Sequence, residues 1–161
     1  MDDKKRVIAL VLKLDIKMKE IAEMVLAVQL PAYRVEAAII GFYDIPPLKD
    51  TATTLQQCRE TFYGYFLNEE LCGVISLKLE NEIIDIHRLI VHPNHFKKGI
   101  AQKLLTFIEN EYKTKPLKVS TASKNLPAIR FYEKNGFQKC KELTLSEELS
   151  LTFFEKREQT V

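Results

Sequence analysis

Hydrophobic and polar positions along this chain follow two different periods, and the period indicates the type of each element. Runs of aliphatic, β-branched and aromatic residues that are bounded by turn residues are typical of strands. Such runs lie at residues 7–14, 62–66, 71–79, 83–91, 117–121, 137–143 and 149–155. Apolar residues spaced three and four apart are typical of helices. This spacing occurs from Asp15 to Pro31 and over residues 33–40, 51–58, 97–112 and 127–136.

Prolines and a glycine set the expected helix ends near the N-terminus. Pro31 lacks the backbone N–H that a helix interior needs, so we expect it to break the helix that follows Asp15. A second short helix is then expected over residues 33–40, with Gly41 ending it. The two prolines in the segment 45–48 predict a rigid, non-helical turn.

The predicted order is one strand, two or three helices, three strands, a helix, a strand, a helix and two final strands. This order predicts a layered, mixed α/β fold. The strand 83–91, the helix 97–112 and the strand 117–121 are expected to form a right-handed crossover between parallel strands. The helix N-terminus in such a unit is a natural binding site for an anion.

Composition narrows the class of protein. With 161 residues, of which 46% are hydrophobic, the chain is expected to form a single domain, residues 1–161, with its own core. The formal net charge of +2 is too balanced to indicate binding of nucleic acid. The aromatic run 62–66 fits a sheet core better than a platform for stacked bases. No apolar run is long enough for a membrane span, so we expect no membrane partner.

Cysteine and histidine positions argue against disulfides and metals. Cys58, Cys72 and Cys140 are odd in number and have no CxxC spacing, so a reducing cytoplasm fits this chain best. His92 and His95 are three residues apart, but no cysteine or acidic residue accompanies them at ligand spacing. We therefore expect no metal site.

The segment VHPNHFKKGIAQKLL, residues 91–105, carries the first functional signal. Gly99 has no Cβ, and Lys97 and Lys98 add positive charge beside the free N–H groups of a helix N-terminus. These features predict a cradle for phosphate or pyrophosphate. Neither the GxxxxGK[ST] loop nor the GxGxxG fingerprint is present. For this segment alone, the alternative is a solvated basic turn.

A second segment, NLPAIRFYEKNGF at residues 125–137, lies one strand further along. Together the two segments resemble the GNAT superfamily of N-acetyltransferases, which carry a Q/R-x-x-G-x-G/A loop and an N-x-x-A-x-x-x-Y-x-x-x-G-F segment. The resemblance covers residues 83–142 most strongly. Phe96 and Lys97 depart from it, because the family usually has Gln or Arg at the first position and often a further glycine at the second. The resemblance implies a central mixed, mostly antiparallel sheet with a splayed parallel pair and flanking helices.

The resemblance also implies that acetyl-CoA is the cosubstrate. The end of the strand 83–91 would pair with the pantetheine amides like an added strand. The pyrophosphate would lie on the backbone amides of the loop and of the first helical turn. The cofactor-binding residues that this implies are Leu89, Ile90, Val91, Lys97, Lys98, Gly99, Ile100, Ala101, Gln102, Asn125, Ala128 and Tyr132.

The implied reaction is acetyl transfer to a primary amine, of a small molecule or a protein, by direct attack without an acyl-enzyme. Tyr132, at the family's tyrosine position, is the expected acid for the leaving thiolate, and a backbone N–H near Val91 is the expected oxyanion donor. The acceptor pocket is expected to come from the N-terminal helices and the turn after them. Its candidate residues are Tyr33, Glu36 and Tyr43.

Two residues of the strand 83–91 are candidates for the base. Strand alternation predicts that Asp85, His87, Leu89 and Val91 share one face and that Arg88 lies on the other. Either Asp85 or His87 could deprotonate the amine through water, and the sequence leaves both open.

A different class of function also fits these residues. The same cradle would serve a non-catalytic module that binds acyl-CoA as a sensor. Dimers are common in the family that the chain resembles, so a homodimer is an expected partner state.

Overall fold

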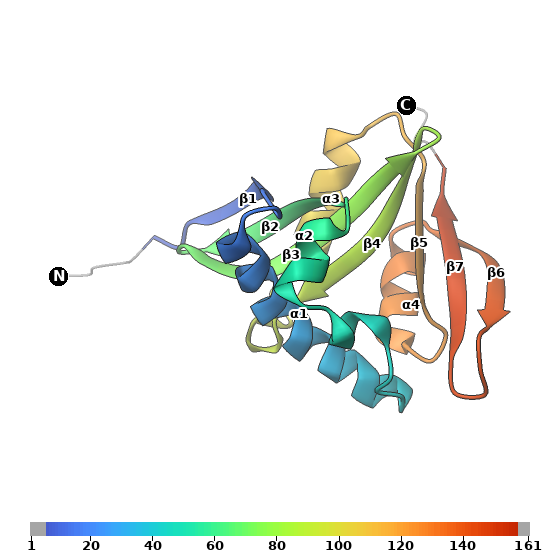
Figure 1. The fold of residues 1–161 in the computed structure, drawn as a ribbon. Helices are drawn as coiled ribbons and strands as arrows, with labels where there is room; N and C mark the ends of the chain where they lie inside the picture. Colours follow the sequence, from blue (N-terminus) through green and yellow to red (C-terminus); the bar gives the residue numbers. More distant parts are fainter. Residues whose placement is uncertain (1–5, 158–161) are drawn as a thin grey trace.

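The computed structural model describes residues 6–157, and its centre is one seven-stranded sheet with the order β1-β2-β3-β4-β5-β7-β6 (Figure 1). The strands are β1 Ala9–Leu14, β2 Thr61–Leu67, β3 Glu70–Glu80, β4 Ile83–Val91, β5 Leu117–Ala122, β6 Gln138–Thr144 and β7 Ser150–Lys156. The helices are α1 Lys19–Ile40, α2 Ala52–Gln57, α3 Ile100–Glu111 and α4 Leu126–Lys134, with short 3-10 turns at Pro46–Lys49 and Pro93–His95. Within the described residues, no helix has the length and apolar character needed to cross a membrane.

The sheet is antiparallel except at one pair. β4 and β5 run parallel, and their register holds only from Ile84 opposite Leu117 to Ile86 opposite Val119. The C-terminal half of β4, residues 87–91, therefore has no strand partner on that side, although it still pairs with β3 on the other. The expected mixed sheet with a splayed parallel pair and flanking helices is confirmed.

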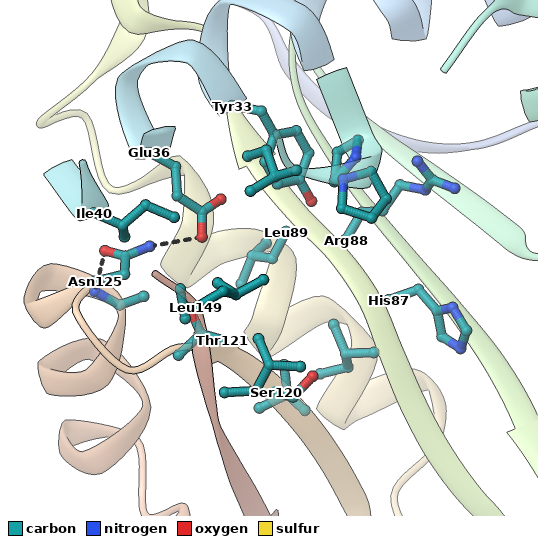
Figure 2. A pocket seen from close by; sticks show the side chains of 18 of the residues that line it. Tyr33, Glu36, Ile40, His87, Arg88, Leu89, Ser120, Thr121, Asn125 and Leu149 are labelled. Carbon is teal, nitrogen blue, oxygen red and sulfur yellow. Dashed lines mark hydrogen bonds between the residues drawn. The ribbon is translucent and has the colours of Figure 1, made fainter. Parts of the chain in front are cut away.

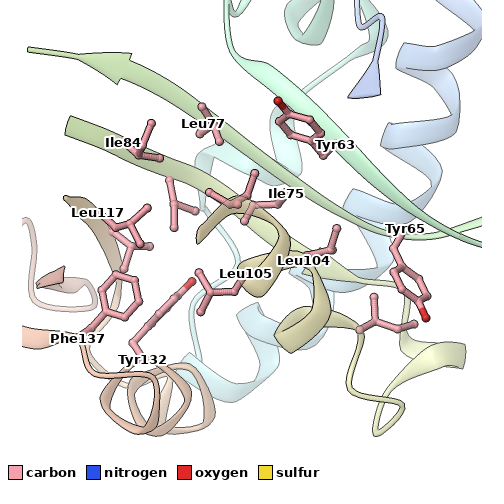
Figure 3. Packing of buried hydrophobic residues seen from close by; sticks show 14 of the residues in the cluster. Tyr63, Tyr65, Ile75, Leu77, Ile84, Leu104, Leu105, Leu117, Tyr132 and Phe137 are labelled. Atoms are coloured by element: carbon pink, nitrogen blue, oxygen red, sulfur yellow. The ribbon is translucent and has the colours of Figure 1, made fainter. Parts of the chain in front are cut away.

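Helices cover both faces of the sheet. On one face, α1 packs against β3 and β4, and Val25 and Val28 of α1 are buried there with Phe62 of β2. On the other face, Leu104 and Leu105 of α3 are fully buried in a cluster with side chains of β3 and β4 (Figure 3). The apolar spacing of three and four residues thus agrees with burial at Val25, Val28 and Leu104, whereas Met24, expected on the same side of α1, is 37% exposed.

The first long helix differs from the expectation, because α1 continues through Pro31 as one helix of 22 residues. Pro31 withholds one backbone N–H from the helix, which weakens it locally. Buried side chains on both sides of the proline, from Val25 and Val28 to Ala37 and Ile40, hold the two parts against the rest of the protein. Tertiary packing therefore overrides the helix-breaking tendency of the proline.

The expected alternation along β4 is also wrong, because the strand contains a bulge at His87. Ser76 of β3 lies opposite Arg88, but Leu77 lies opposite Ile86, so β4 has one extra residue. A bulge exchanges the two faces of a strand beyond it. As a result, Arg88 is on the same side as His87, and both contact Glu60. Leu89 and Val91 instead pack against the core beneath α3.

Candidate active site

Two hollows meet in the part of the molecule where β4 and β5 diverge. The first, called here the polar cavity, has a volume of about 220 Å³ and lies between α1, β4, β5 and α4 (Figure 2). The second, called here the apolar groove, follows the end of β4, residues 96–102, α4 and one side of α1. The residues that line both are Glu36, Leu89, Asn125, Ala128 and Tyr132.

The loop before α3 presents free backbone N–H groups to the apolar groove. The first hydrogen bond of α3 runs from the Lys103 N–H to the Gly99 carbonyl, at 3.1 Å. The N–H groups of the residues between them, 100–102, therefore point out of the helix end without an intrahelical acceptor. Gly99 has a φ of +73°, and a Cβ at this position would have no protein atom within 4 Å. The loop thus offers an open anion cradle, as its sequence predicts.

Gly73 of β3 brings this cradle close to the sheet. A Cβ at Gly73 would lie 2.7 Å from Cγ2 of Ile100 and 3.2 Å from the backbone oxygen of Ile90. Only a glycine allows the first turn of α3 to pack this tightly on β3. The buried Ile100 side chain therefore fixes the helix N-terminus beside the end of β4.

Charged and polar side chains around the groove differ in their orientation. Lys97 lines the groove, and Lys134 at the end of α4, which the sequence did not single out, lines it too. Lys98 does not line it, because its Nζ lies 2.9 Å from Nδ1 of His95. Gln102 Nε2 donates to Oδ1 of Asn135 at 2.8 Å and so ties α3 to the end of α4. Positive charge therefore comes to the groove from both sides.

The C-terminal end of β4 forms the floor of the groove. Leu89, Ile90 and Val91 all line it, and their strand has no partner on the β5 side there. Unpaired strand groups of this kind can form hydrogen bonds with an extended ligand that contains amides. The arrangement therefore suits the pantetheine role that the sequence implied.

Asn125 has a different environment from the one expected. Its Oδ1 accepts a hydrogen bond from the Ala128 N–H at 3.3 Å, which caps α4. Its Nδ2 donates to Oε1 of Glu36 at 3.1 Å (Figure 2). Asn125 therefore joins α4 to α1 with its own side chain, and its role as a direct ligand of the cofactor stays a prediction.

Burial dominates the electrostatics of Glu36. Removal from water raises the pKa of its carboxyl group, and the hydrogen bond from Asn125 opposes this only in part. Among the described residues, Glu36 has no ion-pair partner. A carboxylate of this kind is receptive to a cation that enters from outside the chain.

Tyr132 lies on α4 where the two hollows meet. Its ring is 6% exposed and packs against Phe131, Phe137 and Phe154, with centroids 5.3 to 5.9 Å away (Figure 3). Burial, with the charge of Glu36 as a smaller cause, raises the pKa of the phenol well above its ordinary value. The hydroxyl therefore remains protonated at neutral pH, as a proton donor must.

Tyr33 and Tyr43 have different positions. The hydroxyl of Tyr33 points into the polar cavity, and burial, ahead of the Glu36 charge, raises the pKa of this phenol. Tyr43 is 61% exposed and does not line the cavity. The structure thus brings two of the three expected acceptor residues, Tyr33 and Glu36, to the site.

The two residues expected to act as the base lie away from Tyr132. Asp85 does not line either hollow, and its Oδ2 lies 3.8 Å from Nζ of Lys118 and 3.4 Å from Nε2 of His87. The His87 ring donates toward this Asp85 carboxylate, and that interaction raises the pKa of His87. His87 lines the edge of the polar cavity, but its ring points away from the Glu36 and Asn125 side (Figure 2). The structure therefore brings neither side chain to the meeting point.

Sequence reasoning missed the part played by Arg88. Its guanidinium bonds Oδ2 of Asp50 at 2.7 Å, Oε1 of Gln29 at 3.0 Å, and both carboxylate oxygens of Glu60 at 3.0 and 3.1 Å. Ser76 Oγ donates to Glu60 as well, at 2.7 Å. We call these five residues the Arg88 cluster. It joins α1, the loop before α2 and the residue just before β2 to strands β3 and β4, so it holds one wall of the polar cavity in place.

One group of possible metal ligands occurs within residues 6–157. Atoms of Glu70, Cys72 and His95 lie within 4.8 Å of one another. The Lys98 ammonium against Nδ1 of His95 favours a proton on Nε2 of that ring, and a protonated nitrogen does not bind metal. Burial also raises the pKa of the Cys72 thiol, which opposes formation of a thiolate ligand.

Comparison with known proteins gives the same picture as the geometry. The chain is 42% identical over 135 residues to UPF0157 protein YqkA of Bacillus subtilis (strain 168), which covers 83% of this chain and 39% of that protein. It is 33% identical over 79 residues to a streptothricin acetyltransferase of Escherichia coli, which covers 47% of this chain and 45% of that protein. The chain thus spans less than half the length of these two relatives.

A solved structure and a family model extend the comparison. The PaiA N-acetyltransferase from Thermoplasma acidophilum, crystallised with coenzyme A, matches with a TM-score of 0.74 and 22% identity, over 93% of this chain and 99% of that one, which shows a shared fold. The model of the acetyltransferase (GNAT) family matches residues 23–137. Acetyl-CoA is the cosubstrate of that family. The protein with this cradle, groove and polar cavity therefore belongs to the GNAT family of acetyltransferases.

Proposed function

We propose that this protein transfers the acetyl group of acetyl-CoA to a primary amine by direct attack. The observation that carries the proposal is the junction of the groove and the polar cavity. A groove with free helix amides opens at Tyr132 onto a cavity that contains a half-buried carboxylate, Glu36. A thioester at that junction would meet an amine that entered from the other side.

Each part of the cosubstrate has a complementary surface. The N–H groups of residues 98–102, with Lys97 and Lys134 nearby, suit the pyrophosphate. The unpaired end of β4, residues 89–91, suits the pantetheine amides. Contacts from Asn125 and Ala128 of α4 are part of the same proposal.

Proton transfer at the sulfur is assigned to Tyr132. Its hydroxyl keeps its proton at neutral pH, because burial raises its pKa. It would donate to the thiolate as the carbon–sulfur bond breaks. A backbone N–H near Val91 would stabilise the oxygen that becomes negative as the amine attacks.

The acceptor class follows from the polar cavity. Its small volume, about 220 Å³, suits a small amine or the end of a single side chain, and Glu36 favours a cationic one. Streptothricin belongs in the acceptor panel because one relative bears the name streptothricin acetyltransferase. The panel should also contain simple alkylamines and peptides with free amino groups.

Cofactor binding is tested first, by calorimetric titration with acetyl-CoA of the wild type and of two alanine variants. Gly99 and Gly41 both have positive φ, +73° and +71°, and a Cβ at either meets no protein atom within 4 Å. Gly99→Ala and Gly41→Ala should therefore suffer similar backbone strain, but only the first adds a methyl group to the cradle. We expect Gly99→Ala to weaken binding by about tenfold or more, equal to roughly 1.4 kcal/mol, and Gly41→Ala to leave it unchanged.

Catalysis is tested by thiol release from acetyl-CoA in the presence of the amine panel. Turnover with an amine, lost in Tyr132→Phe, supports the enzyme. Acetyl-CoA binding without thiol release for any amine would support the alternative, a non-catalytic acyl-CoA-binding module. Absence of acetyl-CoA binding by folded wild type would overturn both.

Three broader points belong to the same proposal. We propose that residues 1–161 act as one acetyltransferase domain, that the protein works in the cytoplasm, and that it forms a homodimer. The cytoplasmic location is supported by Cys58, Cys72 and Cys140, which are all free thiols. Size-exclusion chromatography with light scattering tests the dimer.

A further inference from the structure

Glu36 differs from the other partly or fully buried carboxylates of residues 6–157 in what neutralises it. Asp50 and Glu60 are bound by the Arg88 guanidinium. Glu109 is paired with Lys156, whose Nζ lies 2.6 Å away. Glu36 has only the neutral amide of Asn125, 3.1 Å from Oε1. A carboxylate removed from water without a cation destabilises the folded protein, so its retention at this place points to a ligand that supplies the charge.

The position of Glu36, as well as its lack of a cation partner within residues 6–157, points to a role at the site. It is on α1, but it lines both the polar cavity and the groove, together with Tyr132. Glu36 and Tyr132 line the same stretch of both hollows, although they come from different helices. An amine that is bound at Glu36 would therefore stand beside the residue proposed to protonate the leaving sulfur.

Asn125 fixes the direction of the Glu36 carboxylate. Its Oδ1 is used by the Ala128 N–H, so its Nδ2 must be the group that faces Glu36. The same side chain thereby caps α4, the helix that carries Tyr132. Side chains from α1 and α4, 89 positions apart in the chain, are thus locked in one arrangement at the junction.

We propose, on the basis of the proposed function, that Glu36 binds the ammonium group of a cationic acceptor and takes its proton, and that Asn125 is the positioning residue for this carboxylate. The ammonium N–H bond breaks and the proton moves to a Glu36 oxygen, from which water removes it. The neutral amine then forms the new C–N bond, and the C–S bond breaks. As the C–N bond forms, nitrogen loses its second proton, which passes through water to the Tyr132 oxygen and replaces the proton that Tyr132 gave to the leaving sulfur.

The groups around Glu36 define how its protonation responds to pH. Tyr33 lies on the same helix, Tyr132 on α4, and Arg88 on β4, with Glu60 behind Arg88. Both phenols stay neutral near pH 7, and Arg88 stays charged and occupied by its own carboxylates. The raised pKa of Glu36 moves its ionisation toward neutral pH, and His87, at the edge of the cavity with a raised pKa of its own, is the other group that titrates nearby. Activity should rise with pH as this carboxyl group ionises.

The decisive variant is Glu36→Gln, which keeps the size of the side chain and an acceptor for Asn125. Glu23→Gln is the matched control, because Glu23 is on the same helix and its side chain is 58% exposed. With an alkylamine acceptor, such as 1,4-diaminobutane or the best cationic amine of the panel, we expect kcat/KM to fall roughly 100-fold or more in Glu36→Gln only. In the same variant, the fall of kcat/KM at acidic pH should also disappear.

The variant Asn125→Ser tests whether Asn125 orients the Glu36 carboxylate or only supports the fold. Serine can still cap α4, but it is too short to replace the bond to Glu36. Because that bond lowers the pKa of Glu36, its loss should move the acidic limb of the profile to higher pH. A purely structural role for Asn125 would reduce activity without moving the limb.

The outcomes distinguish this proposal from the proposed function. Acetyl-CoA binding should be unchanged in Glu36→Gln, so loss of turnover with intact cofactor binding supports the assignment. Unchanged kcat/KM and an unchanged pH profile in Glu36→Gln would overturn it while leaving the acetyltransferase activity in place. A wild type that binds acetyl-CoA but acetylates only amines that are uncharged at neutral pH, such as aniline, would also overturn it.

Discussion

Two buried acidic regions lie on the α1 side of β4, and they are built in opposite ways. In the Arg88 cluster, burial alone would raise the pKa values of Asp50 and Glu60, but hydrogen bonds from Arg88 outweigh it and hold both below their ordinary range. At Glu36, burial dominates and the pKa is raised. The first region keeps its negative charge at neutral pH because a cation is built in, whereas the second has no cation among residues 6–157.

This difference indicates that the Arg88 cluster has a structural role, whereas Glu36, on the same cavity, is available for a ligand. The Arg88 cluster connects a helix, two loop segments and two strands, and all of its charges are used in those connections. Glu36 makes one hydrogen bond and keeps a second carboxylate oxygen for the cavity. A partly buried carboxylate that faces a cavity and has no cation among the described residues is better explained by a ligand than by packing.

The largest expected effect comes from removing the cation of the first region. Arg88→Met leaves the carboxylates of Asp50 and Glu60 without the guanidinium that neutralises them, so we expect a loss of about 3–5 kcal/mol in the free energy of unfolding. Urea unfolding followed by circular dichroism measures it. The control is Arg34→Met on the exposed side of α1, which should change stability by no more than about 0.5 kcal/mol. Equal effects in both variants would show that the cluster does not hold the wall.

A second effect is the loss of stability in acid that follows from the lowered pKa of Glu60. Because Glu60 has a lower pKa when folded than when unfolded, its stabilisation is present above the unfolded value, near 4.3, and is lost as pH falls through the folded value. Glu60→Gln should lower stability at pH 7 by roughly 1–3 kcal/mol and flatten this acid dependence. Urea titrations at several pH values check it, with Glu147→Gln on an exposed turn as the control.

At Glu36 we expect a smaller effect on stability, with the opposite dependence on pH. Its folded pKa is raised, so the wild type loses stability as pH rises from the unfolded value through the folded one. Glu36→Gln removes this loss, and we expect equal or greater stability at pH 7, by up to about 1 kcal/mol, together with lower activity. A clearly destabilised Glu36→Gln at neutral pH would mean that the carboxylate has a structural partner after all.

The smallest effect is expected at His87. Its pKa is raised by Asp85, so its contribution is present below the ordinary histidine value, near 6.5, and fades as pH rises through the folded value. Since the ring is about one-third exposed, His87→Asn should cost less than about 1 kcal/mol at pH 6 and nothing at pH 9. Thiol-release assays on the same variant should give wild-type rates. A large loss of the thiol-release rate in His87→Asn would mean that His87, and not Glu36, acts as the base.

Local signals in the sequence were enough to predict the elements at the proposed cofactor side of the site. The apolar period of α3, the lysines and Gly99 before it, and the helical pattern of residues 127–136 each act over a few positions. Such short-range preferences predict where elements begin and end, and they place a free helix end after a strand. The resemblance of residues 83–142 to the family could be seen for the same reason.

The catalytic side was decided by tertiary structure. The bulge at His87 depends on the register with β3, and it turned Arg88 toward α1 and removed His87 from the junction. The continuation of α1 through Pro31 brought Glu36 opposite Asn125. No local period specifies either event, because both follow from the burial and pairing of segments that are distant in the chain. The sequence alone therefore determined that a free helix end would form beside Gly99. Only the packed fold decided which carboxylate lies where the groove meets the polar cavity.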